Sequence, residues 1–444
     1  MLKQITVDML NRLETAARAQ QQRAPLANAI ARNSLRAMAY RQTALREAQH
    51  TFSLELPTGK ITAQNSSGRC WLFAGLNVLR IGTMKKLNLE TFEFSQNYQM
   101  FWDKVEKVNF FLESILSTLD EPTEGRLVNW LLGSPLNDGG QWEMFVNLVE
   151  KYGVVPKYAM PETYHSSNTG EMNWVLTLRL REDAARLRDA YRAGVSVEEL
   201  RSRKEAMLFE SYRLLVECLG EPPDTFDLEL RDKDDNYIQV QGITPLEFAE
   251  QYVPTRPADY VSLINAPTAD KPYGKVYTVK YLGNVIGGRD VLYLNVDVAT
   301  LKRLTLAQLQ DGEPVWFGSD VGKMMDRETG ALHADLYDVS QLVGFELGLS
   351  KAERLDYRDS AMTHAMVFLG VNLVDGVPNR WKVENSWSEK AGRDGYFVMS
   401  DRWFDEYLYQ VVLHRKYLSP EMLDAFSAEP IALEPWDPMG SLAR

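Results

Sequence analysis

Between residues 64 and 74 the chain reads Gln64-Asn65-Ser66-Ser67-Gly68-Arg69-Cys70-Trp71-Leu72-Phe73-Ala74. The serines and the glycine predict a loop, and the apolar residues that follow predict a helix over residues 71–87. Cys70 lies where the loop passes into the helix, and a helix N-terminus carries free N–H groups and partial positive charge that favour a thiolate. Cys70 is therefore a candidate nucleophile, although a lone cysteine is more often a buried structural residue.

A cysteine nucleophile needs a base, and the chain has only five histidines. We single out His364 because it lies in an apolar predicted strand over residues 363–371, although such a histidine is more often a hydrogen-bonded core residue. Asn385 follows another predicted strand, residues 381–384. Its amide is able to accept a hydrogen bond from the imidazole and fix the tautomer, although Asn-Ser-Trp by itself also suits an ordinary turn. Cysteine, histidine and asparagine in this order match the rule for papain-type peptidases.

Gln64 lies six residues before Cys70 and is a candidate oxyanion donor. Its side-chain amide and the backbone N–H of Cys70 would together hold the negative charge that develops on a substrate carbonyl. Further along, Asn137-Asp138-Gly139-Gly140 predicts a turn ahead of a helix over residues 141–152. Each of these signals is weak alone, and their combination in one order favours a cysteine peptidase.

Composition narrows the class of protein and its compartment. Hydrophobic residues make up 45% of the 444 residues, and the net charge of −12 argues against a general nucleic-acid or anionic-membrane binder. The only cysteines are Cys70 and Cys218, which fits a reducing cytosol better than secretion. We see no signal peptide and no apolar stretch of membrane-spanning length, so we expect a soluble cytoplasmic protein.

The motifs together resemble the bleomycin hydrolase and aminopeptidase C branch of the papain-like cysteine peptidases. The resemblance extends to His50-Thr51-Phe52-Ser53, Thr363-His364-Ala365-Met366, Trp381-Lys382-Val383-Glu384-Asn385-Ser386-Trp387 and Glu434-Pro435-Trp436-Asp437-Pro438-Met439-Gly440. It implies an α+β fold with a helical lobe and an antiparallel, barrel-like β lobe. It also implies that Cys70 is the nucleophile, His364 the general base and acid, and Asn385 the orienting residue. Gln64 would be the oxyanion donor.

The resemblance also bears on Gly139 and Gly140. Gly140 matches the papain glycine whose backbone pairs with the bound peptide, although a plain turn glycine is equally consistent with the sequence. Simple papain-like enzymes that are secreted carry C-G-[SA]-C-W, whose first cysteine forms a disulfide. Here Ser66 and Ser67 occupy that region and no cysteine precedes Cys70, which again suits the cytosol.

His364 follows Cys70 by 294 residues, instead of the roughly 130–150 of simple papain-like enzymes, so a long segment must be inserted. The predicted regions are an N-terminal helical segment (1–50), a helical lobe (51–165), a mainly helical insertion for oligomerisation (166–290), a β lobe (291–418) and a tail reaching the active site (419–444). In the family, such insertions build subunit contacts, and six subunits enclose a channel lined by the active sites. We therefore expect a homohexamer.

The family's tail lies in the active-site cleft and limits the enzyme to aminopeptidase action, which makes Ala443 and Arg444 candidate substrate-binding residues. If Ala443 belongs at the limit of the cleft, Arg444 reaches past it toward Cys70, and the enzyme would remove its own last residue. The expected substrates are short peptides with free N-termini.

Two other functions remain open at this point. A transglutaminase-like acyltransferase would need aspartate where Asn385 stands. A non-catalytic nucleic-acid-binding or scaffolding protein on a peptidase fold is the second alternative, and the net charge of −12 weighs against it. The chain has no H-E-x-x-H, which argues against a metalloaminopeptidase, so we expect no metal or cofactor. The favoured interpretation is a cytosolic cysteine aminopeptidase.

Overall fold

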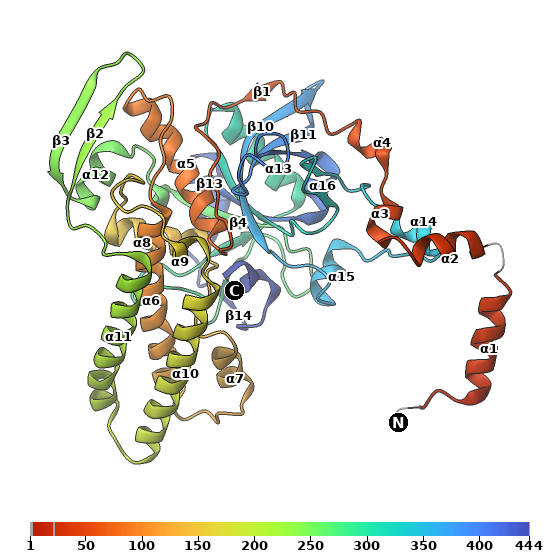
Figure 1. Ribbon diagram of the computed structural model, residues 1–444, viewed down its shortest axis with the longest axis horizontal. Coiled ribbons are helices and arrows are strands. Elements are labelled where there is room, and N and C mark those ends of the chain that lie inside the picture. Colours follow the sequence, from red (N-terminus) through yellow and green to blue (C-terminus); the bar gives the residue numbers. More distant parts are fainter. Residues whose placement is uncertain (1–2, 21–22, 444) are drawn as a thin grey trace.

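The protein has an α+β fold in which a helical lobe packs against a lobe built on one large sheet (Figure 1). The computed structural model describes residues 3–20 and 23–443. One cluster of buried side chains runs through both lobes, from Trp71 and Phe101 on helices to Trp316 and Phe368 on strands. The predicted fold class is therefore confirmed, and the two lobes share a continuous core.

The helical lobe is organised around α5 (Cys70–Lys86), which begins one residue ahead of the helix predicted from the sequence. Every residue of α5 from 70 to 80 is buried, as expected of a helix that is apolar on nearly all sides. It packs against α6 (Gln96–Ser117) and α8 (Trp142–Tyr152), and α7 (Arg126–Gly133) packs on α6. The helix predicted over residues 141–152 is α8, so it is confirmed.

A helical pair follows and runs alongside α6 (Figure 1). The first part of the insertion predicted at 166–290 forms α10 (Gly170–Arg192) and α11 (Val197–Leu219), with Gly194 between them. A row of α10 leucines at helical spacing is buried, and this row is Leu176, Leu180 and Leu187. The short α9 (Tyr164–Ser167) leads into the pair.

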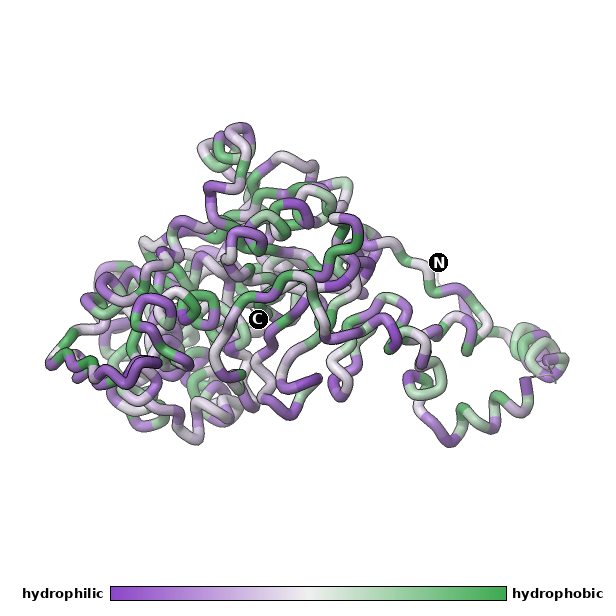
Figure 2. Tube along the Cα trace, turned by 90° about the horizontal axis from the view of Figure 1, so that it is seen from above, coloured by the Kyte–Doolittle hydropathy of each residue, from purple (hydrophilic) through white to green (hydrophobic). Residues whose placement is uncertain are grey.

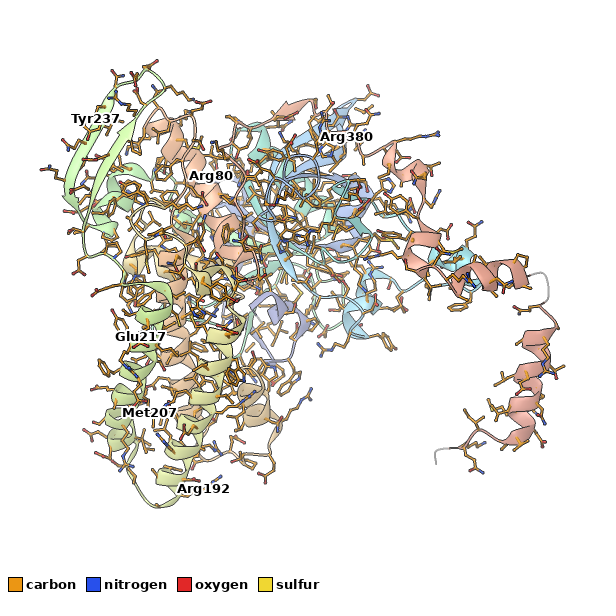
Figure 3. All side chains as sticks on the ribbon, viewed as in Figure 1. Arg80, Arg192, Met207, Glu217, Tyr237 and Arg380 are labelled. Atoms are coloured by element: carbon orange, nitrogen blue, oxygen red, sulfur yellow. The ribbon has the colours of Figure 1, made fainter. Side chains whose placement is uncertain are left out.

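A two-stranded hairpin, β2 (Phe226–Arg231) and β3 (Tyr237–Ile243), comes next in the chain. Figure 3 labels Tyr237 on this hairpin and Arg192 at the end of α10, at opposite ends of the helical lobe. The predicted insertion at 166–290 thus holds both helices and strands.

The second lobe is built on a twelve-stranded sheet that includes the long strand β10 (His364–Val374). β10 pairs antiparallel with β7 (Val315–Ser319) and β11 (Val377–Glu384), and α5 packs against β10 and β7. The sheet also takes in β4 (Tyr260–Ile264), so it begins earlier in the chain than the β lobe predicted at 291–418. All of β4 is buried, so it lacks the polar–apolar alternation that marks a strand in a sequence.

The remaining elements complete the two lobes. The other strands are β1 (Leu54–Glu55), β5 (Val276–Val279), β6 (Tyr293–Asn295), β8 (Met325–Asp326), β9 (Ala331–Leu332), β12 (Tyr396–Ser400), β13 (Leu408–His414) and β14 (Ile431–Leu433). The other helices of the body are α12 (Pro245–Tyr252), α13 (Val298–Gln310), α14 (Val339–Val343), α15 (Lys351–Asp356), α16 (Asp401–Tyr407) and α17 (Pro420–Ala425). The sheet order is β14-β5-β6-β4-β13-β7-β10-β11-β12-β9-β8, and β1 pairs with β10.

The two chain ends have different surroundings (Figures 1 and 2). α1 (Val7–Arg18) stands apart from the body in both views and has no buried residue. The predicted N-terminal helical segment continues as three short helices: α2 (Ala24–Ile30), α3 (Leu35–Ala39) and α4 (Gln42–Leu45). The other end enters the body and finishes as the 3₁₀ helix η4 (Pro438–Ala443). No helix within residues 3–20 or 23–443 is long and apolar enough to cross a membrane.

Candidate active site

Cys70 is the first residue of α5, with Arg69 in the N-cap position. The thiol is buried, and the backbone N–H groups of Ala365, Trp71 and Cys70 itself face it. Burial raises the pKa of the Cys70 thiol to about 11, and these N–H groups offset only part of the rise. The predicted helix start is confirmed. Burial of the thiol thus opposes the thiolate that the helix N-terminus favours.

His364 opens β10 and pairs with Ser319 of β7. Its Nε2 donates a hydrogen bond to Asn385 Oδ1 at 2.8 Å, and the ring of Trp387 lies 4.8 Å from the imidazole between centroids. Burial lowers the pKa of His364 to about 4, and the bond to Asn385 offsets only part of the drop. The imidazole is therefore neutral at pH 7, with Nδ1 as its proton acceptor.

The fold brings Cys70 and His364 together across 294 residues of sequence. The N–H that faces the thiol belongs to Ala365, the residue directly after His364. Asn385 follows β11, the strand next to β10, and its Oδ1 also accepts from the backbone N–H of Ser386 at 2.8 Å. The helical lobe thus supplies the thiol, and the sheet supplies the imidazole and the amide. Cys218 lies on α11, in the helical pair.

Gln64 is buried and is tied to the segment that carries Asn385. Its Oε1 accepts a hydrogen bond from Ser386 Oγ at 2.6 Å, and its backbone N–H donates to the Ser386 carbonyl at 2.8 Å. One N–H of its side-chain amide donates to the Ser67 carbonyl at 2.6 Å, which leaves the second N–H for a substrate. The first N–H groups of α5, beginning with Cys70, lack partners within the helix, so two kinds of oxyanion donor are present.

Gly139 and Gly140 form a buried turn held against the nucleophile's helix. Lys107 Nζ donates to the Gly139 carbonyl, and the Trp71 indole N–H donates to the Asp138 carbonyl at 2.7 Å. A Cβ at Gly140 would lie 2.5 Å from the Trp71 ring, so this position must be glycine for packing reasons alone. The turn therefore lies beside Cys70, whether or not its backbone also pairs with a peptide.

The end of the tail lies against β7 and the segment that leads into β10, the strand that begins at His364. Ser441 Oγ donates to the Met362 carbonyl at 2.8 Å, two residues before His364. Leu442 is buried beside Gly318 of β7, where a Cβ would come within 3.5 Å of it. Ala443 ends η4, and Arg444 lies outside the described residues, so its predicted place is untested.

Further contacts anchor the tail along its length. Lys271 pairs with Asp437 at 3.0 Å, and the Arg126 guanidinium lies 3.7 Å from the centroid of the Trp436 ring. A largely apolar pocket of about 310 Å³ is lined by α6 and α7 residues together with Pro435 and Gly440 of the tail. Lys107, which holds the Gly139 carbonyl, also lines this pocket. The tail thus forms one wall of a pocket that adjoins the predicted substrate turn.

A buried ion pair beside the site was missed by the sequence analysis. The Glu384 carboxylate accepts hydrogen bonds from Arg80 Nη2 at 2.6 Å, from Asn77 Nδ2 at 2.7 Å and from Thr58 Oγ1 at 2.7 Å. Arg80, labelled in Figure 3, lies on α5, and Glu384 directly precedes Asn385, so the pair joins the nucleophile's helix to the orienting residue's strand. An arginine within the apolar run Val78-Leu79-Arg80-Ile81 was the signal available in the sequence.

These groups suit acyl transfer through a cysteine nucleophile: a thiol, a neutral imidazole, an amide that fixes the imidazole and donors for an oxyanion. Within residues 3–20 and 23–443 no cluster of three or more histidine, cysteine, aspartate or glutamate side chains is placed to hold a metal ion. A nucleophile from a helical lobe facing a base from a β lobe is the arrangement of the papain-like cysteine peptidases.

The chain belongs to the Peptidase C1-like family, whose model matches residues 4–440. It is 50% identical over 443 residues to Aminopeptidase C of Listeria innocua, covering 100% of both chains. It is 47% identical over 414 residues to human bleomycin hydrolase, covering 91% of each. A crystal structure of PepW from Lactobacillus rhamnosis matches with a TM-score of 0.96 at 48% identity, over 99% of both chains. The family resemblance seen in the motifs is confirmed.

Proposed function

We propose that this protein is a cytosolic cysteine aminopeptidase that removes N-terminal residues from short peptides. The observation that carries the proposal is the position of the tail: Ser441 and Leu442 lie against β7 and the start of β10, beside the candidate catalytic group. A chain end there leaves room for the beginning of a peptide and obstructs its middle. Several relatives at about half identity are named Aminopeptidase C.

In the proposed reaction the imidazole of His364 takes the thiol proton as Cys70 Sγ attacks the carbonyl carbon of the first residue. The oxyanion accepts from the Cys70 backbone N–H and the Gln64 amide. His364 then gives the proton to the leaving amine, and a water molecule activated by the same imidazole hydrolyses the thioester. Asn385 accepts from Nε2 throughout, which leaves Nδ1 to exchange the proton with the thiol.

The tail's terminal carboxylate would meet the free α-amine of the substrate. Opposite charges about 4 Å apart attract by about 4 kcal/mol at an effective dielectric of 20, and desolvation takes back part of that. In this proposal Ala443 carries the carboxylate after Arg444 has been removed by the enzyme itself. Gly139 and Gly140 would hold the substrate backbone.

We also propose that the protein assembles as a homo-oligomer, with a hexamer as the expected state. α1 and the helical pair both expose large apolar side chains, among them Leu13, Trp174 and Phe209. Such side chains suit contacts between copies. The two free cysteines and the net charge of −12 fit a cytosolic protein that binds neither membranes nor nucleic acid.

The test compares matched peptides that differ only in a free or an acetylated N-terminus, with and without prior alkylation of thiols. We expect rapid release of the first residue from the free peptide, little cleavage of the acetylated one, and no activity after alkylation. Equal cleavage of both peptides would refute aminopeptidase action, and activity that survives alkylation of Cys70 would refute the cysteine mechanism.

A further inference from the structure

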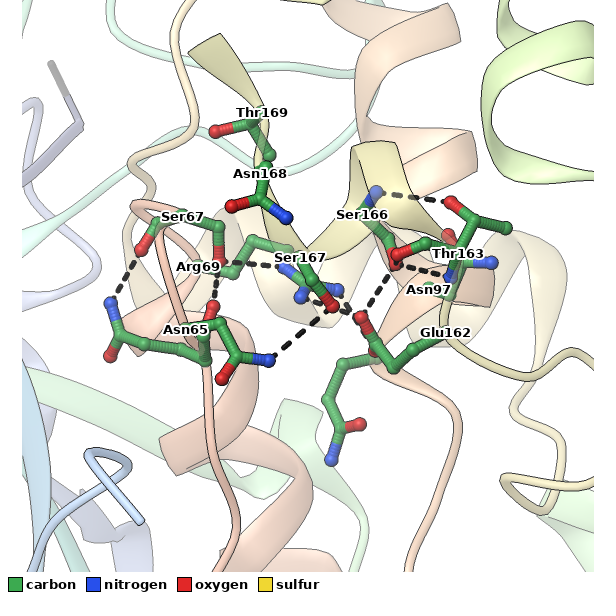
Figure 4. A network of polar contacts seen from close by, with 12 residues as sticks. Asn65, Ser67, Arg69, Asn97, Glu162, Thr163, Ser166, Ser167, Asn168 and Thr169 are labelled. Atoms are coloured by element: carbon green, nitrogen blue, oxygen red, sulfur yellow. Dashed lines mark hydrogen bonds and ion pairs between the residues drawn. The ribbon is translucent and has the colours of Figure 1, made fainter.

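The side chain of Arg69, the residue before Cys70, is completely buried. Its guanidinium donates two parallel hydrogen bonds to the Glu162 carboxylate, Nη1 to Oε1 at 3.0 Å and Nη2 to Oε2 at 2.8 Å (Figure 4). Ser166 Oγ donates to the same carboxylate at 2.6 Å. Burial opposes the charge on Glu162, yet Arg69 holds the pKa of this carboxyl below its ordinary value, so the pair is ionised at neutral pH.

The third donor of the guanidinium reaches the loop before the nucleophile. Arg69 Nε donates to Ser67 Oγ at 2.9 Å, and this hydroxyl donates to the Gln64 carbonyl at 2.6 Å. The Gln64 side-chain amide donates in turn to the Ser67 carbonyl. A rigid planar group thus fixes the loop on one side and Glu162 on the other (Figure 4).

The Arg69 backbone also helps to position the second oxyanion donor, the backbone N–H of Cys70. Its carbonyl accepts from the N–H groups of Leu72 and Phe73, which starts α5 and directs the N–H of Cys70. Arg69 therefore affects Gln64 through the Ser67 side chain, and it affects the Cys70 N–H through the backbone at the start of α5. No cysteine precedes Cys70 to brace this loop with a disulfide.

We propose that Arg69 and Glu162 form a buried clamp that positions the two oxyanion donors, which makes Glu162 a positioning residue for the reaction. The clamp rests on the proposed function and extends it by assigning a role to a carboxylate that does not touch the reacting atoms. Glu162 lies two residues before α9, which leads into the helical pair, so the clamp also links that pair to the nucleophile loop.

The test is Glu162→Gln, measured by peptide hydrolysis and by alkylation of Cys70 with iodoacetamide. Alkylation needs the thiol and the imidazole but forms no oxyanion. We expect kcat to fall about 10- to 100-fold, less than the loss of a whole donor, with KM little changed and the alkylation rate unchanged. In a Gln64→Ala background, the same substitution should lower kcat by a clearly smaller factor, because one of the two donors that the clamp positions is gone and only the Cys70 N–H remains to be displaced.

Glu150→Gln is the matched control. Glu150 also accepts two hydrogen bonds from one guanidinium, from Arg289 Nε at 3.0 Å and Nη2 at 2.9 Å, but both side chains are about half exposed and lie outside the site. We expect this variant to keep kcat and the alkylation rate. Ser67→Ala offers a second approach that leaves the ion pair intact and removes only its link to Gln64. It should lower kcat several-fold, again with unchanged alkylation.

Three results would overturn the clamp: an unchanged kcat in Glu162→Gln, a parallel loss of alkylation, or full additivity with Gln64→Ala. If Glu162→Gln fails to fold, Ser67→Ala decides, and an unchanged kcat there rejects the proposal. These outcomes are separate from the failure of the proposed function, which would appear as activity retained by Cys70→Ala.

Discussion

The two ends of the chain carry similar apolar residues, but those of α1 are exposed and those of the tail are buried. In α1, Val7 is 72% exposed and Leu13 is 55% exposed, and no residue of the helix is buried. In the tail, Met439 and Leu442 are 1% and 3% exposed. Burying such side chains stabilises a structure by about 1.5–3 kcal/mol each relative to exposing them. The tail gains this stabilisation because its apolar side chains are buried in the body of the protein, whereas those of α1 are not.

Polar anchors account for the difference. The tail has β14 paired with β5, the Lys271–Asp437 ion pair and the stacking of Arg126 on Trp436. α1 shows an apolar face at helical spacing, and none of its residues is buried against the part of the chain that the structure describes. An apolar face of this kind suits the proposed contact with a second copy, whereas an anchored tail beside the candidate catalytic group suits the proposed control of access.

The largest expected effect tests whether the site beside the tail is catalytic at all. Cys70→Ala should abolish peptide hydrolysis and leave the fold intact, because no other group in the site can form the thioester. The matched change Cys218→Ala, on α11, should leave kcat unchanged. Intact-mass measurement extends the test: active protein should lack Arg444, and Cys70→Ala should keep it. Loss of activity only in Cys218→Ala would reject the assignment.

Removal of the residues after Pro438 should produce the next largest effect. Without the terminal carboxylate we expect kcat/KM for free-amine peptides to fall about 10- to 100-fold, which corresponds to the part of the attraction that survives desolvation. Acetylated and longer peptides should become substrates, as measured by mass spectrometry of the products. A truncated enzyme that still rejects acetylated peptides would show that the tail does not set specificity.

Substitutions in α1, at the N-terminal end of the chain, should change the oligomeric state and leave kcat unchanged. Leu13→Asp puts a charge on the apolar face of α1 and should shift the oligomer toward smaller species in light scattering. Asn11→Asp adds the same charge at a polar position of the same helix and should not. Neither should change the melting temperature of the protomer much, because α1 buries nothing within it. A monomer at micromolar concentration in the unmodified protein would remove the oligomer proposal.

The acid limb of the pH profile reports on burial at the site. His364 must be neutral to accept the thiol proton, and its pKa is lowered to about 4. Activity should therefore persist above that value and fall as the pH drops through about 4, instead of near the ordinary value of about 6.5. Removing the tail should move this limb upward if the tail contributes to the burial, and removing α1 should not move it.

Much of the site could be predicted because its signals are local. The loop before Cys70, the helix after it and the apolar strand of His364 all follow from neighbouring residues. The contacts that hold these pieces join distant residues: Arg69 and Glu162 are 93 apart, and Arg80 and Glu384 are 304 apart. The spacing of residue types along the sequence does not reveal which distant residues pair in this way.

The pKa values and the extent of the sheet escaped prediction for related reasons. A helix N-terminus alone favours a thiolate, and only the folded structure shows that burial outweighs it at Cys70. β4 is buried on both faces, so its short apolar run could equally have been a loop or part of a helix.

The smallest expected effect probes a single anchor of the tail. Lys271 is buried and pairs with both Asp270 and Asp437, so Asp437→Asn weakens the tail's docking without leaving the ammonium unpaired. We expect docking to weaken by about 1 kcal/mol, so the undocked fraction should rise about fivefold, with a matching rise in cleavage of acetylated peptides. Glu434→Gln is the control, because its ion pair with Lys280 is about half exposed and such pairs contribute about 0–1 kcal/mol. Equal effects of the two changes would mean that the tail is held by its apolar side chains and not by the buried ion pair. The comparison of the two chain ends would then rest on the buried Met439 and Leu442, the β14–β5 pairing and the Arg126–Trp436 stacking, without the ion pair.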